Sequence, residues 1–183
     1  MADPLPIFTV GHSTRTIAEF VALLRAGGVQ AVVDIRTVPR SRTNPQYDLD
    51  ALPGALAPFQ IAHGRIEALG GLRGKSGVPA EVNAFWRNQS FHNYADYALS
   101  QAFRDGLAEL IGAAAARRTA IMCAEAVWWR CHRRIVADYL IVEGRGVFHL
   151  MGEDSVIPAT MTDAAIGAPD GLHYPAAGDA TTG

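Results

Sequence analysis

Hydrophobic positions follow two different spacings at the start of the chain. Residues 5–10, LPIFTV, form a short apolar run that predicts a strand. Residues 16–26 open with T-x-x-E, the capping box of a helix start, and continue with apolar residues at helical spacing up to a Gly-Gly pair at 27–28. Residues 29–35, VQAVVDI, predict a second strand. Strand, helix and strand in this order form a βαβ unit, whose strands are parallel.

The rest of the chain continues the alternation of helices and strands. In order, the pattern predicts a loop over 36–58 with a short helix after Asp48, a strand in 61–69, a helix over 93–116, a strand at 119–122, a helix over 130–142 and a last strand at 147–151. This order predicts a single α/β domain over residues 1–151. We expect a mainly parallel sheet flanked by helices, in a rhodanese/Rossmann-like three-layer arrangement.

Residues 152–183 differ in composition from the domain before them. From residue 158 they are rich in Ala, Gly, Thr, Pro and Asp and show neither a helical nor a strand period. They predict an irregular C-terminal tail, either ordered throughout or disordered at its end.

Composition and charge narrow the class of protein. The chain has 183 residues, 49% of them hydrophobic, and a formal net charge of -2. Such a chain can bury a substantial core, and its near-neutral charge argues against nonspecific binding to nucleic acid or membranes. It shows no signal-peptide pattern and no run approaching the ~20 apolar residues of a membrane helix. Two cysteines do not make a disulfide scaffold. We therefore expect a cytoplasmic protein with reduced thiols and no membrane association.

Polar residues follow three of the predicted strands at the point where each strand ends. The first strand leads into His12 and Ser13, the second into Arg36, Arg40 and Arg42, and the fourth into Cys123, Glu125 and Arg130. Ligands of open parallel sheets bind beyond the carboxyl ends of the strands. The three clusters therefore predict one common site.

Cys123 is the candidate nucleophile of this site. It leaves a strand just before a predicted helix, and both the helix N-terminus and nearby arginines favour a thiolate. The alternative is a buried thiol at a strand end. The order strand, Cys, loop, Arg, helix is analogous to phosphatase and rhodanese loops. However, the spacing from Cys123 to Arg130 is one residue longer than in the phosphatase signature, and the loop contains no glycine.

Cys131 and His132 open the predicted helix that follows this loop. Cys131 is in register with Ile135 and Tyr139 on the inward stripe, which favours core packing. His132 fits either an acid–base group or a hydrogen-bonded structural residue. The two cysteines lack the C-x-x-C spacing of redox pairs and the paired spacing of structural zinc sites, so we predict no metal or other cofactor. A composite metal site that includes His12 is the alternative.

Two further motifs have structural and functional interpretations. Trp128 and Trp129 point in different directions on any regular element, so at least one can be exposed to stack on a base, although packing of both is the simpler interpretation. GGLRGKS, residues 70–76, is not a P-loop, because Leu69 stands where that motif needs glycine. It is either a plain turn or a lid in which Lys75, the only lysine, contacts an anion.

Several segments together resemble domain-of-unknown-function family 488. They are VGHSTRTIAEFVALL, VVDIRTVPRSRTNPQYD, the LGG of residues 69–71, FHNYADY and IMCAEAVWWRCHRR. The resemblance implies an α/β domain whose matching polar residues share a site, but it implies no reaction. The matching residues are His12, Ser13, Asp34, Arg36, Pro39, Arg40, Ser41, Arg42, Cys123, Glu125, Cys131, His132 and Arg133. The family often has an Asp-Pro-like turn where this chain has Val127 and Trp128.

Three functions are consistent with these residues. The first is a thiol-dependent hydrolase or transferase, with Cys123 as the thiolate and Glu125 or His132 as the acid or base. Its anionic substrate, a phosphate ester, a nucleotide or a nucleic-acid end, would be bound by His12, Ser13, Arg36, Arg40, Arg42, Lys75, Arg130 and Arg133. The second is a noncatalytic nucleotide or nucleic-acid binding module that uses the same arginines. The third is a structural role, with both thiols buried and the arginines paired with acidic residues.

Overall fold

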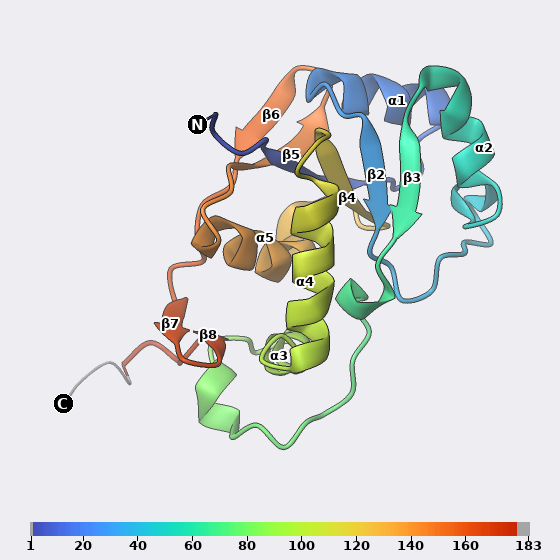
Figure 1. Ribbon diagram of the computed structural model, residues 1–183. Coiled ribbons are helices and arrows are strands. Elements are labelled where there is room, and N and C mark those ends of the chain that lie inside the picture. Colours follow the sequence, from blue (N-terminus) through green and yellow to red (C-terminus); the bar gives the residue numbers. More distant parts are fainter. Residues whose placement is uncertain (1, 179–183) are drawn as a thin grey trace.

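Six strands form one sheet in the order β3-β2-β4-β1-β5-β6 in the computed structural model, which describes residues 2–178 (Figure 1). The strands are β1 (Ile7–Gly11), β2 (Ala31–Asp34), β3 (Ala62–Arg65), β4 (Thr119–Cys123), β5 (Val147–Gly152) and β6 (Ser155–Pro158). The helices are α1 (Ile17–Ala26), α2 (Leu52–Leu56), α3 (Gln89–Tyr97), α4 (Gln101–Ala113) and α5 (Arg133–Val142). The first five strands are mutually parallel, and only β6 runs antiparallel to its neighbour.

The βαβ start is built as its sequence pattern predicts. The Thr16 hydroxyl accepts a hydrogen bond from the Glu19 backbone, and the Glu19 carboxylate accepts one from the Thr16 backbone, which closes the capping box. The helix α1 ends at Gly27, and Gly28 follows with a φ of 62°, a conformation that glycine adopts without strain. Local signals alone therefore fix both ends of α1.

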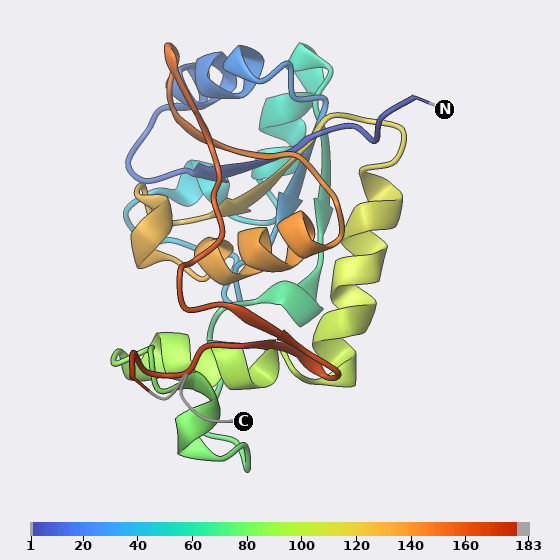
Figure 2. The ribbon, with the colours of Figure 1, turned by 90° about the vertical axis from the view of Figure 1, so that its left-hand side faces the viewer.

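Helices cover both faces of the sheet, which gives three layers (Figure 2). The helices α1 and α2 pack on one face against alternate strand residues such as Val10, Val32 and Met122. The helices α4 and α5 pack on the other face, against residues of the opposite parity such as Val33 and Ile121. The prediction of an α/β domain with a mainly parallel sheet is confirmed.

One predicted helix is two helices in the structure. The pattern over 93–116 spans both α3 and α4, which are separated by residues 98–100. The Ser100 hydroxyl accepts a hydrogen bond from the Phe103 backbone and so begins a new helix. The direction change at this cap places α3 at the end of α4, beside the opening described below (Figures 1 and 2).

The C-terminal segment is more regular than expected. Besides β6 it contains β7 (Ile166–Ala168) and β8 (Gly171–His173), which form an antiparallel hairpin. Its side chains are anchored, because the buried Tyr174 hydroxyl donates to Asp138 and the Leu172 backbone donates to the Tyr139 hydroxyl. The prediction of an irregular tail is therefore wrong for these stretches. The alternative of disorder at the end falls on residues 179–183, outside the described residues.

Candidate functional site

The three polar clusters meet at one edge of the sheet, as the strand predictions require. The strands β2, β4 and β1 are adjacent and parallel, and Gly11 pairs with Cys123 in register. Beyond the strand ends, the backbones of His12 and Ser13 donate hydrogen bonds to the carbonyl groups of Cys123 and Ala124. The loop after β4 is thus held directly against the loop after β1.

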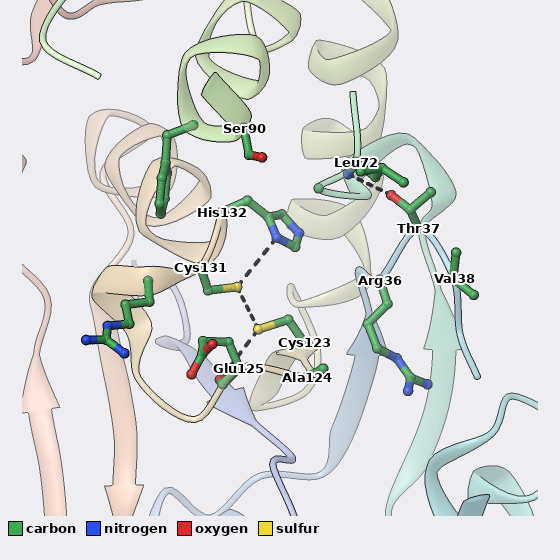
Figure 3. Close-up of a pocket in the computed structure, with 13 residues that line it drawn as sticks. Arg36, Thr37, Val38, Leu72, Ser90, Cys123, Ala124, Glu125, Cys131 and His132 are labelled. Atoms are coloured by element: carbon green, nitrogen blue, oxygen red, sulfur yellow. Dashed lines mark hydrogen bonds between the residues drawn. The ribbon is translucent and has the colours of Figure 1, made fainter. Parts of the chain in front are cut away.

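A pocket of about 400 Å³ opens at this edge (Figure 3). It is lined by Arg36, Thr37, Val38, Gly71, Leu72, Ser90, Phe91, Cys123, Ala124, Glu125, Arg130, Cys131 and His132. The pocket combines two sulfur atoms, an imidazole and a carboxylate with an apolar rim. Such convergence of reactive and apolar groups in a cavity is typical of small-molecule sites.

The two thiols are in direct contact at the inner end of the pocket. Cys123 ends β4, the chain passes through the 3₁₀ turn of Trp128–Arg130, and Cys131 returns to face it with its Sγ atom 2.6 Å from that of Cys123. Both are free cysteines and both are buried. Seven residues lie between them in sequence, so their contact depends on the path of the intervening loop.

His132 is held in one orientation beside the thiols. Its Nε2 atom lies 2.9 Å from the Ile35 carbonyl, which can only accept, so Nε2 carries a hydrogen. Its Nδ1 atom then faces the Cys131 Sγ atom at 3.5 Å. Gly71 leaves room for the ring, since a Cβ atom there would lie 2.4 Å from Nδ1. The arrangement can move a proton between Cys131 and His132.

Electrostatics reverse the expected roles of the two cysteines. Burial, the hydrogen bond with Cys131 and repulsion from a Cys131 thiolate raise the pKa of Cys123 well above its ordinary value. Burial also disfavours the Cys131 thiolate, but the hydrogen bond from Cys123 and the charges of His132 and Arg133 outweigh it and lower the pKa of Cys131 well below its ordinary value. Negative charge on the pair is therefore favoured on Cys131, whereas the sequence pattern predicts a Cys123 thiolate.

Local hydrogen bonds differ between the two sulfur atoms. The Cys123 thiol donates to the Glu125 carbonyl at 3.7 Å, and the Glu125 backbone lowers the pKa of Cys123 by less than burial raises it. Cys131 instead faces the Arg133 backbone N–H at 3.5 Å, directly before α5. The partial positive charge of a helix N-terminus favours an anion at that position.

Arg133 is a fully buried cation behind the thiols. Its guanidinium donates to the Glu125 carbonyl at 2.6 Å and to the Thr9 hydroxyl at 3.3 Å. Within residues 2–178, no carboxylate forms an ion pair with it, and its Nε atom has no partner. A buried cation needs a compensating negative charge. A thiolate on the cysteine pair is the group placed to supply it.

The other predicted binding residues are dispersed. Arg36 lines the pocket, but its guanidinium is occupied by a two-point ion pair with Asp34 and a bond to the Tyr47 carbonyl. Figure 3 shows it pointing away from the sulfur atoms. Arg40 and Arg42 are exposed and do not line the pocket. Lys75 lines a second cavity, near Asp96 and Asp170. Of the predicted arginines, only Arg130 is both exposed and in the pocket wall.

His12 and Ser13 support the site from behind rather than lining it. The buried His12 ring donates from Nδ1 to the Ser13 carbonyl, accepts from Arg36 at Nε2 and stacks on Tyr47 at 4.2 Å. Burial and the Arg36 charge lower its pKa, so the ring is neutral. A composite metal site is not supported either, because within residues 2–178 no three His, Cys, Asp or Glu side chains are grouped to hold a metal ion.

The apolar rim of the pocket was not predicted from the sequence. Val38 and Leu72 are exposed by 61% and 70%, and Phe91 forms part of the wall. The lining residues that were not predicted as catalytic or binding residues are Thr37, Val38, Gly71, Leu72, Ser90, Phe91, Ala124 and Cys131. The LGG motif was a signal for one of them, since Gly71 is required by its contact with His132.

The two tryptophans have different environments. Trp128 is half-buried and stacks on His149 at 4.5 Å, whereas Trp129 is 47% exposed. The simpler interpretation, that both tryptophans pack, is therefore wrong for Trp129, and the alternative of one exposed tryptophan holds. His149 is buried, and its Nδ1 atom is hydrogen-bonded to the Thr9 hydroxyl at 2.6 Å, whose oxygen accepts from Arg133. Arg133 is therefore held by Thr9, which is held by His149, on which Trp128 stacks.

Burial and the Arg133 charge lower the pKa of His149 from 6.5 to about 4. Between these values the unfolded chain binds a proton that the folded chain does not, so this contribution to stability is lost as the pH falls through that window. We expect the loss to be on the order of 3 kcal/mol at pH 4, from 1.36 kcal/mol per pKa unit. Urea unfolding at several pH values would measure it.

The matched control for this pH dependence is His149→Gln. It should show a shallower fall in stability between pH 6.5 and 4, with the remainder due to His12 and His63, whose pKa values burial also lowers. An unchanged slope in His149→Gln would contradict the assignment.

The part of the chain that forms the site matches a known family. The family model described as "Domain of unknown function DUF488" matches residues 16–140, more than half of the chain. The chain belongs to this family. The DUF488 match includes both cysteines, His132, Arg133 and all of the pocket-lining residues, and it ends within α5, before β5.

The other comparisons add no relative. No curated protein and no solved structure matches the chain. Among residues 2–178, no helix is both long enough and apolar enough to cross a membrane.

Proposed function

We propose that this DUF488 protein is a thiol-dependent transferase or hydrolase in which Cys131 is the nucleophile. The observation that carries the proposal is the position of Cys131. Its sulfur lies in the pocket wall at the start of α5, between the Cys123 thiol at 2.6 Å and the His132 imidazole at 3.5 Å. A cysteine beside a histidine and a helix N-terminus is poised as a thiolate at neutral pH.

Each residue around Cys131 has a separate role in such a reaction. His132 takes the Cys131 proton at Nδ1 and is then placed to protonate the leaving group, while the Ile35 carbonyl fixes its tautomer. Arg133 stabilises the negative charge of the thiolate from behind. Glu125 lines the pocket with its carboxylate exposed and serves as the second acid–base group.

The pocket favours a small substrate with one anionic group and an apolar portion. Arg130 supplies an exposed positive charge in the pocket wall, and Val38, Leu72 and Phe91 supply apolar surface. A phosphate ester or nucleotide that carries an apolar ring fits this description. The alternative, a noncatalytic binding module built on an arginine cluster, has less support, because Arg36 and Arg133 are occupied by internal partners.

Iodoacetamide labelling as a function of pH tests the proposed nucleophile. We expect Cys131 to label at pH 7, well below the unperturbed thiol pKa of about 8.5, and at least ~10-fold faster than Cys123. Peptide mass spectrometry would assign each modified cysteine. The Cys131→Ser variant should not label rapidly, whereas Cys123→Ser should still label at Cys131. Labelling of Cys123 first, or of neither cysteine before unfolding, would refute the proposal.

A further inference from the structure

We propose that Cys123 is a resolving thiol and that the site also accepts a second class of substrate, a small disulfide carrying an anionic group. The inference rests on the proposed function, in that it takes Cys131 as the attacking thiolate. It is carried by the contact between the two sulfur atoms, which lie 2.6 Å apart in the wall of the same pocket. Any group transferred to Cys131 is therefore placed next to a second thiol.

The position of Cys123 fits attack on a modified Cys131. Cys123 is the last residue of β4, and its carbonyl is fixed by the His12 backbone, so its sulfur has a defined place. Because the two sulfur atoms are already in contact, a bond between them needs no rearrangement of the chain. A hydrolase that uses a single thiol has no need of a second one at this distance, and water would compete poorly with it.

The charges of the site favour reaction of Cys131 before reaction of Cys123. The hydrogen bond from Cys123 and the charges of His132 and Arg133 favour negative charge on Cys131, and the Cys123 thiol faces the Glu125 carbonyl. When Cys131 forms a mixed disulfide, its charge is lost and the buried Arg133 cation is left without a counter-charge. Deprotonation of Cys123 restores that charge. Cys123 thus becomes reactive only after Cys131 has reacted.

The proposed cycle has three steps. The Cys131 thiolate attacks one sulfur of R–S–S–R, which forms Cys131–S–S–R and releases R–S⁻. Cys123 gives its proton to that thiolate and attacks the Cys131 sulfur, which forms the Cys123–Cys131 disulfide and releases the second R–S⁻. The substrate gains two electrons and the cysteine pair loses two. A dithiol reductant then returns the pair to the reduced state by the same exchange chemistry.

The apolar rim and Arg130 suit an aromatic disulfide that carries a carboxylate. The reagent 5,5′-dithiobis(2-nitrobenzoate) has this structure, and the thiolate that it releases is coloured. We expect one molecule of reagent to react with one molecule of reduced wild-type protein and to release both coloured thiolates. Intact-mass spectrometry should then show a protein without attached reagent whose cysteines no longer label with iodoacetamide. Dithiothreitol should restore the labelling.

Two variants separate failure of this inference from failure of the proposed function. Cys123→Ser should release one coloured thiolate and retain the other half of the reagent on Cys131, and Cys131→Ser should react slowly. If the wild-type protein also retains the mixed disulfide, Cys123 is not a resolving thiol, although Cys131 remains the nucleophile. If Cys131 reacts in neither wild-type protein nor Cys123→Ser, the proposed function fails as well.

Folding of the variants is checked independently. Cys123→Ala removes the hydrogen bond that lowers the pKa of Cys131, so it should react with the reagent more slowly than Cys123→Ser but should likewise retain the mixed disulfide. Thermal unfolding followed by circular dichroism should show a cooperative transition for each variant. A retained mixed disulfide in both folded Cys123 variants, together with its absence in the wild-type protein, is the result that the inference requires.

Discussion

Replacing Arg133 by Met is expected to slow iodoacetamide labelling of Cys131 at pH 7 by at least ~10-fold. Arg133 is fully buried, and its positive charge lowers the pKa of Cys131 together with the hydrogen bond from Cys123 and the charge of His132. Each unit by which the Cys131 pKa rises above the working pH reduces the thiolate fraction about tenfold. Labelling rates between pH 5 and 9 would show the titration moving to higher pH.

The same variant should also be less stable, by about 2 kcal/mol. The Arg133 guanidinium donates to the Glu125 carbonyl, and without it a partly buried acceptor loses its partner, which costs roughly 1–3 kcal/mol. Removal of an incompletely paired buried cation offsets part of that cost. Urea unfolding gives the difference in free energy.

Arg134→Met is the matched control for Arg133→Met. Arg134 is the next residue of α5, but its guanidinium lies 4.9 Å from the Trp86 ring centre and its Nε atom donates to Thr162. Unlike Arg133, it is not among the leading causes of the pKa shift of either cysteine. Labelling of Cys131 should therefore be unchanged in Arg134→Met. Equal labelling rates in both variants would show that Arg133 does not stabilise the thiolate.

The second large effect is expected at Gly11, where substitution by Ala should destabilise the fold by about 3 kcal/mol or more. A Cβ atom at Gly11 would lie 1.7 Å from the Glu125 carbonyl oxygen and 2.6 Å from its carbon. These are backbone atoms, so the loop after Cys123 must move as a whole. That loop carries the carbonyl that both Cys123 and Arg133 contact. Cys131 labelling should therefore fall as well.

Gly54→Ala tests whether the Gly11 effect is steric. Gly54 lies in α2, and a Cβ atom there would meet nothing within 4 Å. Alanine in a helix is favoured over glycine by roughly 0.5–1 kcal/mol, so this variant should be as stable as the wild type or slightly more stable. A Gly11→Ala protein that unfolds at the same urea concentration as the wild type would contradict the contact with Glu125.

Most of the fold was predictable because its signals are local. The apolar runs of β1, β2, β4 and β5 and the capping box of α1 are each contained within a few residues. The split between α3 and α4 was not predicted, because the hydrophobic spacing continues across residues 98–100 while the Ser100 cap interrupts the backbone. In the C-terminal segment, Leu172 and Tyr174 are isolated apolar residues among small ones, so β7 and β8 gave no periodic signal.

The location of the candidate site was predictable, but its internal roles were not. Parallel strands bring their carboxyl ends together, which placed Cys123 at the correct edge. Cys131 was interpreted as a core residue because it continues the inward stripe of α5. The helix in fact begins at Arg133, and a 3₁₀ turn directs Cys131 toward Cys123. The internal pairing of Arg36 with Asp34 likewise depends on side-chain conformations that spacing does not specify.

The anchoring of the C-terminal hairpin also constrains when the pocket can form during synthesis. The Phe85 backbone donates to the Tyr174 carbonyl, and the Tyr174 backbone donates to Asn83, just before the helix that carries Ser90 and Phe91. The strand β5, which pairs with β1, likewise follows every pocket-lining residue in sequence. A nascent chain that has emerged only as far as α5 therefore contains every pocket-lining residue but lacks the segments that hold them in place. We expect the two cysteines to be most open to oxidation or modification during this interval.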